Sequence, residues 1–165
     1  LIRKELTKLL PGPASDYERL KVLKFVDAYS WSTGEARPDE KYSISGTLDL
    51  TQLASVITDC GSELGQTVQE KMGGRRVIDS ISSLLVNFDL SSVQKFLSQV
   101  ARTSIAFGGV TTLYLMEEGS VTEQVLNNIK YLMDGVVEFS EVKGKRSLRV
   151  SHMKWVKYSR DSVEW

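Results

Sequence analysis

Hydrophobic residues recur at helical spacing over much of the chain, and the clearest case lies between residues 48 and 72. Apolar side chains there return every three or four positions, which predicts a helix with one face on the core. Asp49 followed by Gln52 is typical of a capping box at the start, and the pair Gly73-Gly74 predicts the end. The apolar positions are Leu50, Leu53, Ala54, Ile57, Leu64, Val68 and Met72.

Three apolar stretches each follow such a helical pattern. Residues 75–79 form a short run that predicts a buried strand ending at Asp79. Residues 110–116 and 136–142 are the other two predicted strands. Because helices and strands alternate, the order favours parallel pairing and an α/β fold. The two later helices are predicted at residues 91–107, from Val93, Phe96, Leu97, Val100, Ala101 and Ile105, and at residues 122–133, from Val125, Leu126, Ile129 and Leu132.

Both ends of the chain depart from this alternation. Lys143-Gly144-Lys145 predicts a tight turn with no helix, so residues 146–154 should form a strand antiparallel to its predecessor. The breaker Pro11-Gly12-Pro13 interrupts the first residues. Around it we expect a short helix at residues 1–10, a strand at residues 20–29 that ends near Asp27, and a loop or flap at residues 30–47.

Length, charge and cysteine content narrow the class of protein. With 165 residues, of which 41% are hydrophobic, we expect one domain. Basic and acidic residues number 21 each, which argues against a protein that coats nucleic acid. Cys60 and His152 are the only residues of their types, so neither a disulfide nor a Cys-rich or His-pair metal motif is expected. The absence of a membrane-length apolar stretch and the lone Cys favour a cytoplasmic protein without membrane contact.

Familiar enzyme signatures are absent from these residues. The P-loop, Gly-x4-Gly-Lys-[Ser/Thr], brings backbone N–H groups and a Lys to phosphate, and Gly144-Lys145 fails to match because Arg146 follows. One predicted parallel strand, however, ends in Asp79 with Ser80 next. In nucleotide hydrolases such an Asp holds a water on the magnesium ion that bridges the phosphates. The alternative is a surface acid where the chain turns into solvent.

Four segments in order resemble the archaeal and bacterial KaiC-like ATPases of the RecA superfamily. The string RRVIDSISSLL at residues 75–85 resembles their Walker B strand, and residues 25–31 resemble the strand before it. Residues 109–117 and 133–137 resemble the strands that follow. The resemblance implies an α/β fold with a RecA-like P-loop NTPase core, which is a mostly parallel sheet flanked by helices with a C-terminal antiparallel hairpin. Residues 1–165 would be one domain that is incomplete at its N-terminal end.

The same resemblance implies roles for three residues at strand ends. Asp79 takes the Walker B role and holds Mg²⁺ through a water, and Glu117 is the second catalytic acid. Ser80 and Glu117 lie near the nucleotide, although Glu117 could instead belong to a solvated loop. A complete family member binds ATP and Mg²⁺. We expect no cofactor for these 165 residues alone, because they contain neither the phosphate-binding loop nor the family's usual catalytic Glu.

The hairpin carries a departure from the family. Where its members have Lys-x-Arg-Gly, which reaches the nucleotide of the adjacent subunit, this chain has His152, Lys154 and Trp155. We expect His152 and Lys154 to lie near a nucleotide, with activation in trans weakened. Lys lacks the planar, two-pronged donor geometry of Arg, and Trp does not adopt the backbone that Gly permits. The alternative for His152 is a half-exposed strand residue.

Two functions follow from the resemblance. The first is a KaiC-like, RecA-superfamily ATPase module that forms a nucleotide-dependent oligomer in signalling or DNA-associated assemblies and does not hydrolyse ATP alone. The second is a non-catalytic scaffold or regulatory subunit that acts through protein–protein association. The sequence immediately before Leu1 would separate them, because a P-loop there supports the first.

The partners that we expect depend on how the sheet is completed. Without the P-loop strand, unpaired backbone groups lie inside a buried sheet, which is costly and recruits other chains. Three explanations are open: a fragment of a longer protein, a rearranged pairing, or completion by a second chain through self-association. Nucleic-acid contact through Lys143 to Arg160, with seven basic and no acidic residues beside Trp155 and Tyr158, is a further possibility. We favour a solvated hairpin there.

Overall fold

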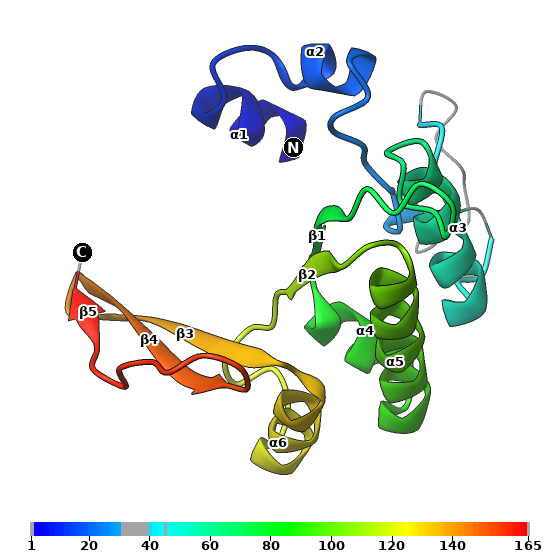
Figure 1. Cartoon of the computed structure of the whole chain (residues 1–165). Helices are drawn as coiled ribbons and strands as arrows, with labels where there is room; N and C mark the ends of the chain where they lie inside the picture. Colours follow the sequence, from blue (N-terminus) through cyan, green and yellow to red (C-terminus); the bar gives the residue numbers. More distant parts are fainter. Residues whose placement is uncertain (1, 31–39, 45, 165) are drawn as a thin grey trace. The chain divides into compact units, whose positions relative to one another are not determined.

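The computed structural model describes residues 2–30, 40–44 and 46–164, which form two compact units (Figure 1). The first unit, Leu1–Met116, contains a parallel pair of strands with helices, and the second, Glu117–Trp165, contains an antiparallel sheet with one helix. The predicted α/β class is therefore confirmed. In the described part of the chain no helix is long and apolar enough to cross a membrane. The expectation of a single domain stays a prediction.

The first unit opens with two short helices, α1 (Ile2–Leu9) and α2 (Ala14–Arg19). The predicted helix at residues 1–10 is confirmed as α1, whereas α2 was not expected because it is only 6 residues long and carries no apolar repeat. Pro13 precedes α2 with a φ of −58°, a value that suits the entry to a helix.

Arg3 connects these helices to the rest of the first unit. Its guanidinium donates to both carboxylate oxygens of Glu18, at 3.0 and 2.9 Å, and to those of Glu40, at 2.8 and 3.1 Å. The same group lies 4.2 Å from the centre of the Phe25 ring. The two carboxylates raise the pKa of Arg3 above its usual value, chiefly through their hydrogen bonds.

The strand predicted at residues 20–29 is wrong. Only an isolated parallel bridge between Asp27 and Ser43 occurs there, in which the Asp27 N–H donates to the Tyr42 carbonyl at 2.8 Å and the Ile44 N–H donates to the Asp27 carbonyl at 3.0 Å. A strand requires a ladder of such bonds, and one bridge does not supply it. Most of the flap predicted at residues 30–47 lies outside the described residues, which omit 31–39 and 45.

Helix α3 spans Leu50–Ser62 and is shorter than predicted. Its start is confirmed, because the Asp49 carboxylate accepts the backbone N–H groups of Thr51 and Gln52 at 2.7 and 3.0 Å. The predicted end of the helix is wrong. The helix stops before Gly65, whose φ of +72° turns the chain out of the helical path. The apolar periodicity beyond that point belongs to turns rather than to a helix.

A parallel pair of strands joins the rest of the first unit. Strand β1 (Gly74–Ile78) pairs in register with β2 (Val110–Tyr114), and helices α4 (Ile81–Asn87) and α5 (Leu90–Ala106) connect them. The strand predicted after α3 is confirmed in its position, but the prediction that it is buried is wrong. Val77 and Leu113, which lie opposite each other, are each 60% exposed, so only one face of the pair is covered.

The core of the first unit lies between α3, α5 and the covered face of the strands (Figure 1). On α5 the predicted stripe is confirmed for its first four members, Val93, Phe96, Leu97 and Val100, all buried. It is wrong for the exposed Ala101 and for Ile105, which is 78% exposed. Near the end of the helix the buried position passes to Ser104, whose hydroxyl donates to the Val100 carbonyl at 2.7 Å.

The second unit is built on an antiparallel sheet. Helix α6 (Glu123–Leu132), capped by Thr122, precedes β3 (Gly135–Val142), which pairs with β4 (Lys145–Met153), and β4 pairs with β5 (Val163–Glu164). The predicted hairpin is confirmed, with φ of +52° at Lys143 and +77° at Gly144, as a two-residue primed turn requires. Parallel pairing of the third predicted strand is wrong, because β3 belongs to this separate sheet.

Glu138 fastens α6 and β4 to β3. Its Oε1 accepts the Lys130 ammonium at 2.8 Å, and its Oε2 accepts the Arg149 guanidinium at 2.5 Å. These two hydrogen bonds, that of Lys130 first, lower the pKa of the Glu138 carboxyl to about 2. A single acid thus links three elements of the second unit.

Removing the Phe96 ring should destabilise the first unit far more than trimming an exposed residue of the same helix. We expect Phe96→Ala to lower the free energy of unfolding by about 3–5 kcal/mol, because the ring is only 2% exposed and leaves a cavity. Ile105→Ala is the matched control and should change it by less than about 0.5 kcal/mol. Urea denaturation followed by circular dichroism measures both, and equal losses would contradict the assignment of the core.

Acid should weaken the second unit through Glu138. The pKa of this carboxyl is lower in the folded than in the unfolded chain, so its stabilisation is complete above about pH 5 and disappears as the pH falls toward 2. Glu138→Gln should remove that part of the pH dependence. Urea midpoints between pH 2.5 and 7 test this, with Glu118→Gln, at an exposed site, as the control. An unchanged slope in Glu138→Gln would refute the linkage.

Candidate functional site

The carboxyl end of β1 is held in place by backbone hydrogen bonds to the end of β2. The Leu115 N–H donates to the Ile78 carbonyl at 3.0 Å, and the Ile81 N–H donates to the Leu115 carbonyl at 2.9 Å. Asp79 and Ser80, joined by a cis peptide bond, lie between these two contacts. The position of Asp79 is therefore set by strand pairing on one side and by the start of α4 on the other.

Asp79 and Ser80 point to different surroundings. Ser80 is buried, and its Oγ accepts the Ser83 N–H at 3.3 Å as the N-cap of α4 and lies 3.2 Å from the Ser83 hydroxyl. Asp79 is exposed. The serine thus fixes the turn from strand to helix, while the carboxylate at this edge of the sheet is accessible to solvent. Such an arrangement can present one negative charge to a ligand above the strand ends.

Glu117 follows the end of β2 but belongs to the second unit. Its carbonyl accepts the Ser120 N–H at 3.3 Å and the Ser120 hydroxyl at 2.7 Å, which closes a turn that contains Gly119 at a φ of +75°. Glu117 and Glu118 are both exposed. The structure brings Asp79 and Ser80 together in the first unit, and it does not include Glu117 in that unit.

His152 and Lys154 also belong to the second unit. His152 is exposed on β4 and lies opposite Val136 of β3, next to a register shift in the pairing. The Lys154 N–H donates to the Asp134 carbonyl at 2.8 Å, and its ammonium lies 3.4 Å from the Asp134 carboxylate. Lys154 is therefore engaged with an acid of its own unit, and Trp155 next to it is largely exposed.

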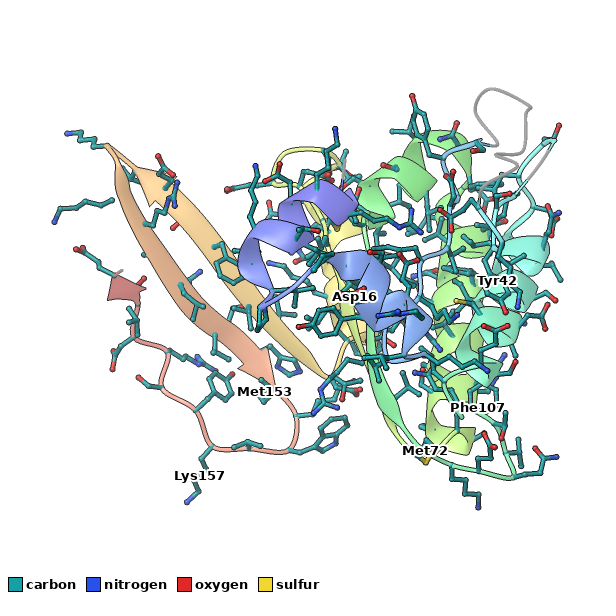
Figure 2. The ribbon with its side chains drawn as sticks, turned by 90° about the horizontal axis from the view of Figure 1, so that it is seen from above. Asp16, Tyr42, Met72, Phe107, Met153 and Lys157 are labelled. Atoms are coloured by element: carbon teal, nitrogen blue, oxygen red, sulfur yellow. The ribbon has the colours of Figure 1, made fainter. Side chains whose placement is uncertain are left out.

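The basic segment from Lys143 to Arg160 is less positive than its sequence indicates. Several of its charges form ion pairs with acids from β3, β5 and the turn before β3. Figure 2 shows Lys157 on the segment that follows Met153, with its side chain directed away from the ribbon. The pairs, besides Arg149–Glu138 and Lys154–Asp134, are Lys145–Glu164 at 3.3 Å and Arg146–Glu141 at 3.0 Å.

A polar cluster that the sequence analysis missed lies under the covered face of β1. The half-buried Arg76 donates to the Gln66 amide oxygen at 3.2 Å and to the Ser104 hydroxyl at 3.4 Å, and burial lowers its pKa. Gln66 and Ser104 are both buried. The alternation of side chains along a strand was the available signal. When two arginines follow each other in a strand, only one of them can face the helices.

The donors present set limits on metal binding. Among the residues that the structure describes, no group of three or more His, Cys, Asp or Glu side chains could hold a metal ion. A single exposed carboxylate at Asp79 suits Mg²⁺ that keeps its waters and is held mainly by phosphates, and it does not suit an all-protein metal site. The residues fit the outer-sphere role only.

Solved structures share this fold, and two of them come from Pyrococcus horikoshii. The first is the uncharacterized protein PH0321 from Pyrococcus horikoshii, in complex with an unknown peptide, with a TM-score of 0.69 and 17% identity over 99% of this chain and 74% of that one. The second is the KaiC-like protein PH0186 from Pyrococcus horikoshii OT3, with a TM-score of 0.60 and 14% identity over 98% of this chain and 63% of that one. At these identities the likeness concerns the fold.

Sequence comparisons give the family. The UPF0273 protein of Aeropyrum pernix is 27% identical over 156 residues, and that of Thermotoga maritima is 28% identical over 149 residues, each covering 87% of this chain. The chain spans 56% and 57% of the length of these curated relatives. DUF7504, described as a family of unknown function, matches residues 3–139. The chain therefore belongs to the DUF7504 family and has the RecA-like fold of the KaiC-like proteins.

Proposed function

We propose that this chain is part of a cytoplasmic, KaiC-like nucleotide-hydrolysing module in which Asp79 is the magnesium-site acid. The Gly-x4-Gly-Lys pattern is absent from these 165 residues, so the groups that hold the phosphates would come from outside them, in the same protein or in another copy. Self-association would bring the parts of such a site together. The buried free thiol of Cys60, whose pKa burial raises to about 11, is compatible with a reducing compartment.

One observation carries the proposal: an exposed carboxylate directly follows a parallel strand whose end is fixed by its neighbour. Ligands of open α/β sheets bind outside the carboxyl ends of the strands, which is where Asp79 lies. The hydrogen bonds of Leu115 with Ile78 and Ile81 hold this edge together, and the Ser80 cap starts α4 there. The Asp79 carboxylate is thus held in position, and it forms no ion pair among the described residues.

The chemistry divides between the metal and the residues of this chain. Mg²⁺, when bound, would supply the positive charge that stabilises phosphoryl transfer. Asp79 would accept a hydrogen bond from a water of that ion and so orient it, and Ser80 would act only by positioning Asp79. Glu117, His152 and Lys154 remain predicted to lie near the nucleotide, and Lys154 would first have to leave Asp134.

Substitution of Asp79 tests this proposal in the natural full-length protein. Because Asp79→Asn removes the charge and keeps the size, we expect Mg²⁺-dependent ATP hydrolysis to fall about 10–100-fold, as for residues that hold a metal through a second sphere. Asp59→Asn, at an exposed site on α3, is the matched control and should hydrolyse ATP as the wild type does.

Circular dichroism and the urea midpoint should be unchanged in both variants, which excludes loss of the fold. Turnover at the wild-type rate in Asp79→Asn would remove Asp79 from the mechanism. A wild-type protein that neither binds nor hydrolyses ATP would reject the nucleotide function as a whole.

The second candidate is a non-catalytic scaffold that acts through association. It is favoured by the large apolar side chains left exposed on both units, among them Val77 and Leu113 on the strand pair and Phe139 on β3. The similar structure of PH0321 contains an unknown peptide, and an open strand edge can accept an extended peptide through backbone hydrogen bonds. Partner binding that persists without ATP and in Asp79→Asn would favour this candidate.

Nucleic-acid binding receives less support from the geometry. The basic residues of the hairpin that form ion pairs with Glu138, Glu141 and Glu164 are not available to neutralise phosphates without losing those pairs. Lys143, Lys157 and Arg160 have no ion pair among the described residues, and three charges support only weak, salt-sensitive binding. We therefore keep this partner as an unfavoured alternative.

A further inference from the structure

The pairing of β4 with β3 contains a β-bulge at Ser151. Val137 lies opposite Val150, and Val136 lies opposite His152, so β4 has one residue more than β3 between these two pairs. A bulge of this kind bends the strand and changes the face to which the side chains beyond it point. Bulges are frequent beside functional sites, where they redirect a side chain.

The bulge places His152 on the charged face of the hairpin. Opposite residues of an antiparallel pair share a face, and so do residues two apart along a strand. His152 is opposite Val136, which shares its face with Glu138, the partner of Arg149. Without the extra residue, His152 would lie opposite Gly135 and point to the other face.

The contacts beyond the bulge agree with this register. A Cβ on Gly135 would lie 2.6 Å from the sulfur of Met153, the residue opposite it. The Lys154 ammonium lies 3.4 Å from the carboxylate of Asp134, which is two residues before Val136 and so shares its face. The bulge thus separates a polar face from an apolar one. The polar face carries the opposite pairs Val136–His152, Glu138–Arg149 and Ser140–Ser147, and the other face carries Val137–Val150 and Phe139–Leu148.

Two hydroxyl groups lie at the bulge. The Tyr158 hydroxyl donates to the Ser151 carbonyl at 3.3 Å, and the Ser151 hydroxyl lies 3.5 Å from the Val136 carbonyl. The extra residue of a bulge is left out of the ladder, so its backbone groups need partners of another kind. Tyr158 supplies such a partner from the segment that follows β4.

We propose that Tyr158 is a positioning residue, which fixes the bulge at Ser151 and thereby directs His152 to the polar face. Lys154, two residues beyond His152, is directed to the same face. The inference rests on the proposed function, in which His152 and Lys154 lie near the nucleotide. Tyr158 acts only through the backbone of β4 and is assigned no contact with the nucleotide.

The neighbour of the His152 ring reports the register directly. In the bulged register the ring is opposite the methyl groups of Val136, whereas in the regular register it is opposite Gly135, which has none. The natural full-length protein without nucleotide should therefore show a nuclear Overhauser effect between the His152 ring and the Val136 methyl groups, assigned by its loss in His152→Gln.

Tyr158→Phe should weaken this signal at least about twofold, because the loss of one hydrogen bond shifts an equilibrium by about fivefold. Tyr131→Phe is the matched control, since Tyr131 lies on α6 of the same unit and is 85% exposed, and it should leave the signal unchanged. Circular dichroism and the urea midpoint show whether each variant is folded.

Hydrolysis of ATP by the full-length protein supplies the second readout. We expect His152→Ala and Tyr158→Phe each to lower kcat about 5–10-fold, because a misplaced group loses its orientation toward the substrate. The double variant should be no slower than the slower single variant, since both changes act through the same imidazole. Tyr131→Phe should turn over at the wild-type rate.

An unchanged signal between His152 and Val136 in a folded Tyr158→Phe would overturn the proposal, as would effects on kcat that multiply in the double variant. Failure of the nucleotide function is seen separately. If the wild type does not hydrolyse ATP, or if His152→Ala is fully active, His152 has no part in turnover. The signal measured without nucleotide still decides whether Tyr158 directs His152.

Discussion

The parallel pairing of β1 with β2 is the interaction on which the first unit depends. Parallel neighbours need a long crossover, and here residues 79–109 supply it as α4 and α5. The crossover brings the buried face of α5 against the pair and leaves both strand ends at one edge. Because Leu115 bonds to both Ile78 and Ile81 there, the same pairing positions Asp79, the only acid of the predicted site that the first unit contains.

The β1–β2 pair is also an incomplete sheet. A parallel sheet is normally covered on both faces and extended by further strands, because open edges and apolar faces are unfavourable in water. Here the pair has one uncovered face, centred on Val77, and β3 belongs to a different sheet. The chain spans 56% and 57% of the length of its curated relatives, which therefore contain residues beyond the matched ones.

The predictions were accurate for features that depend on residues close together in the sequence. The Asp49 cap, the stripe from Val93 to Val100, helix α6 and the Lys143-Gly144 turn all followed from short-range rules of capping, periodicity and left-handed backbone. The prediction was wrong at the strand of residues 20–29, because a strand exists only if a partner pairs with it. Helices α2 and α4 were missed since they are too short to show a period.

The sequence by itself determined the alternation of the longer helices with the strands that follow them, the family resemblance and the identity of the acid after β1. Caps, turns and apolar periods depend on residues within a few positions of one another, and the resemblance depends on short segments in order along the chain. Only the tertiary structure decided that Val77 is exposed, that Arg76 faces Gln66 and that the basic hairpin is partly neutralised by Glu138. Burial and charge pairing depend on groups distant in the chain, and composition records their presence but not their neighbours.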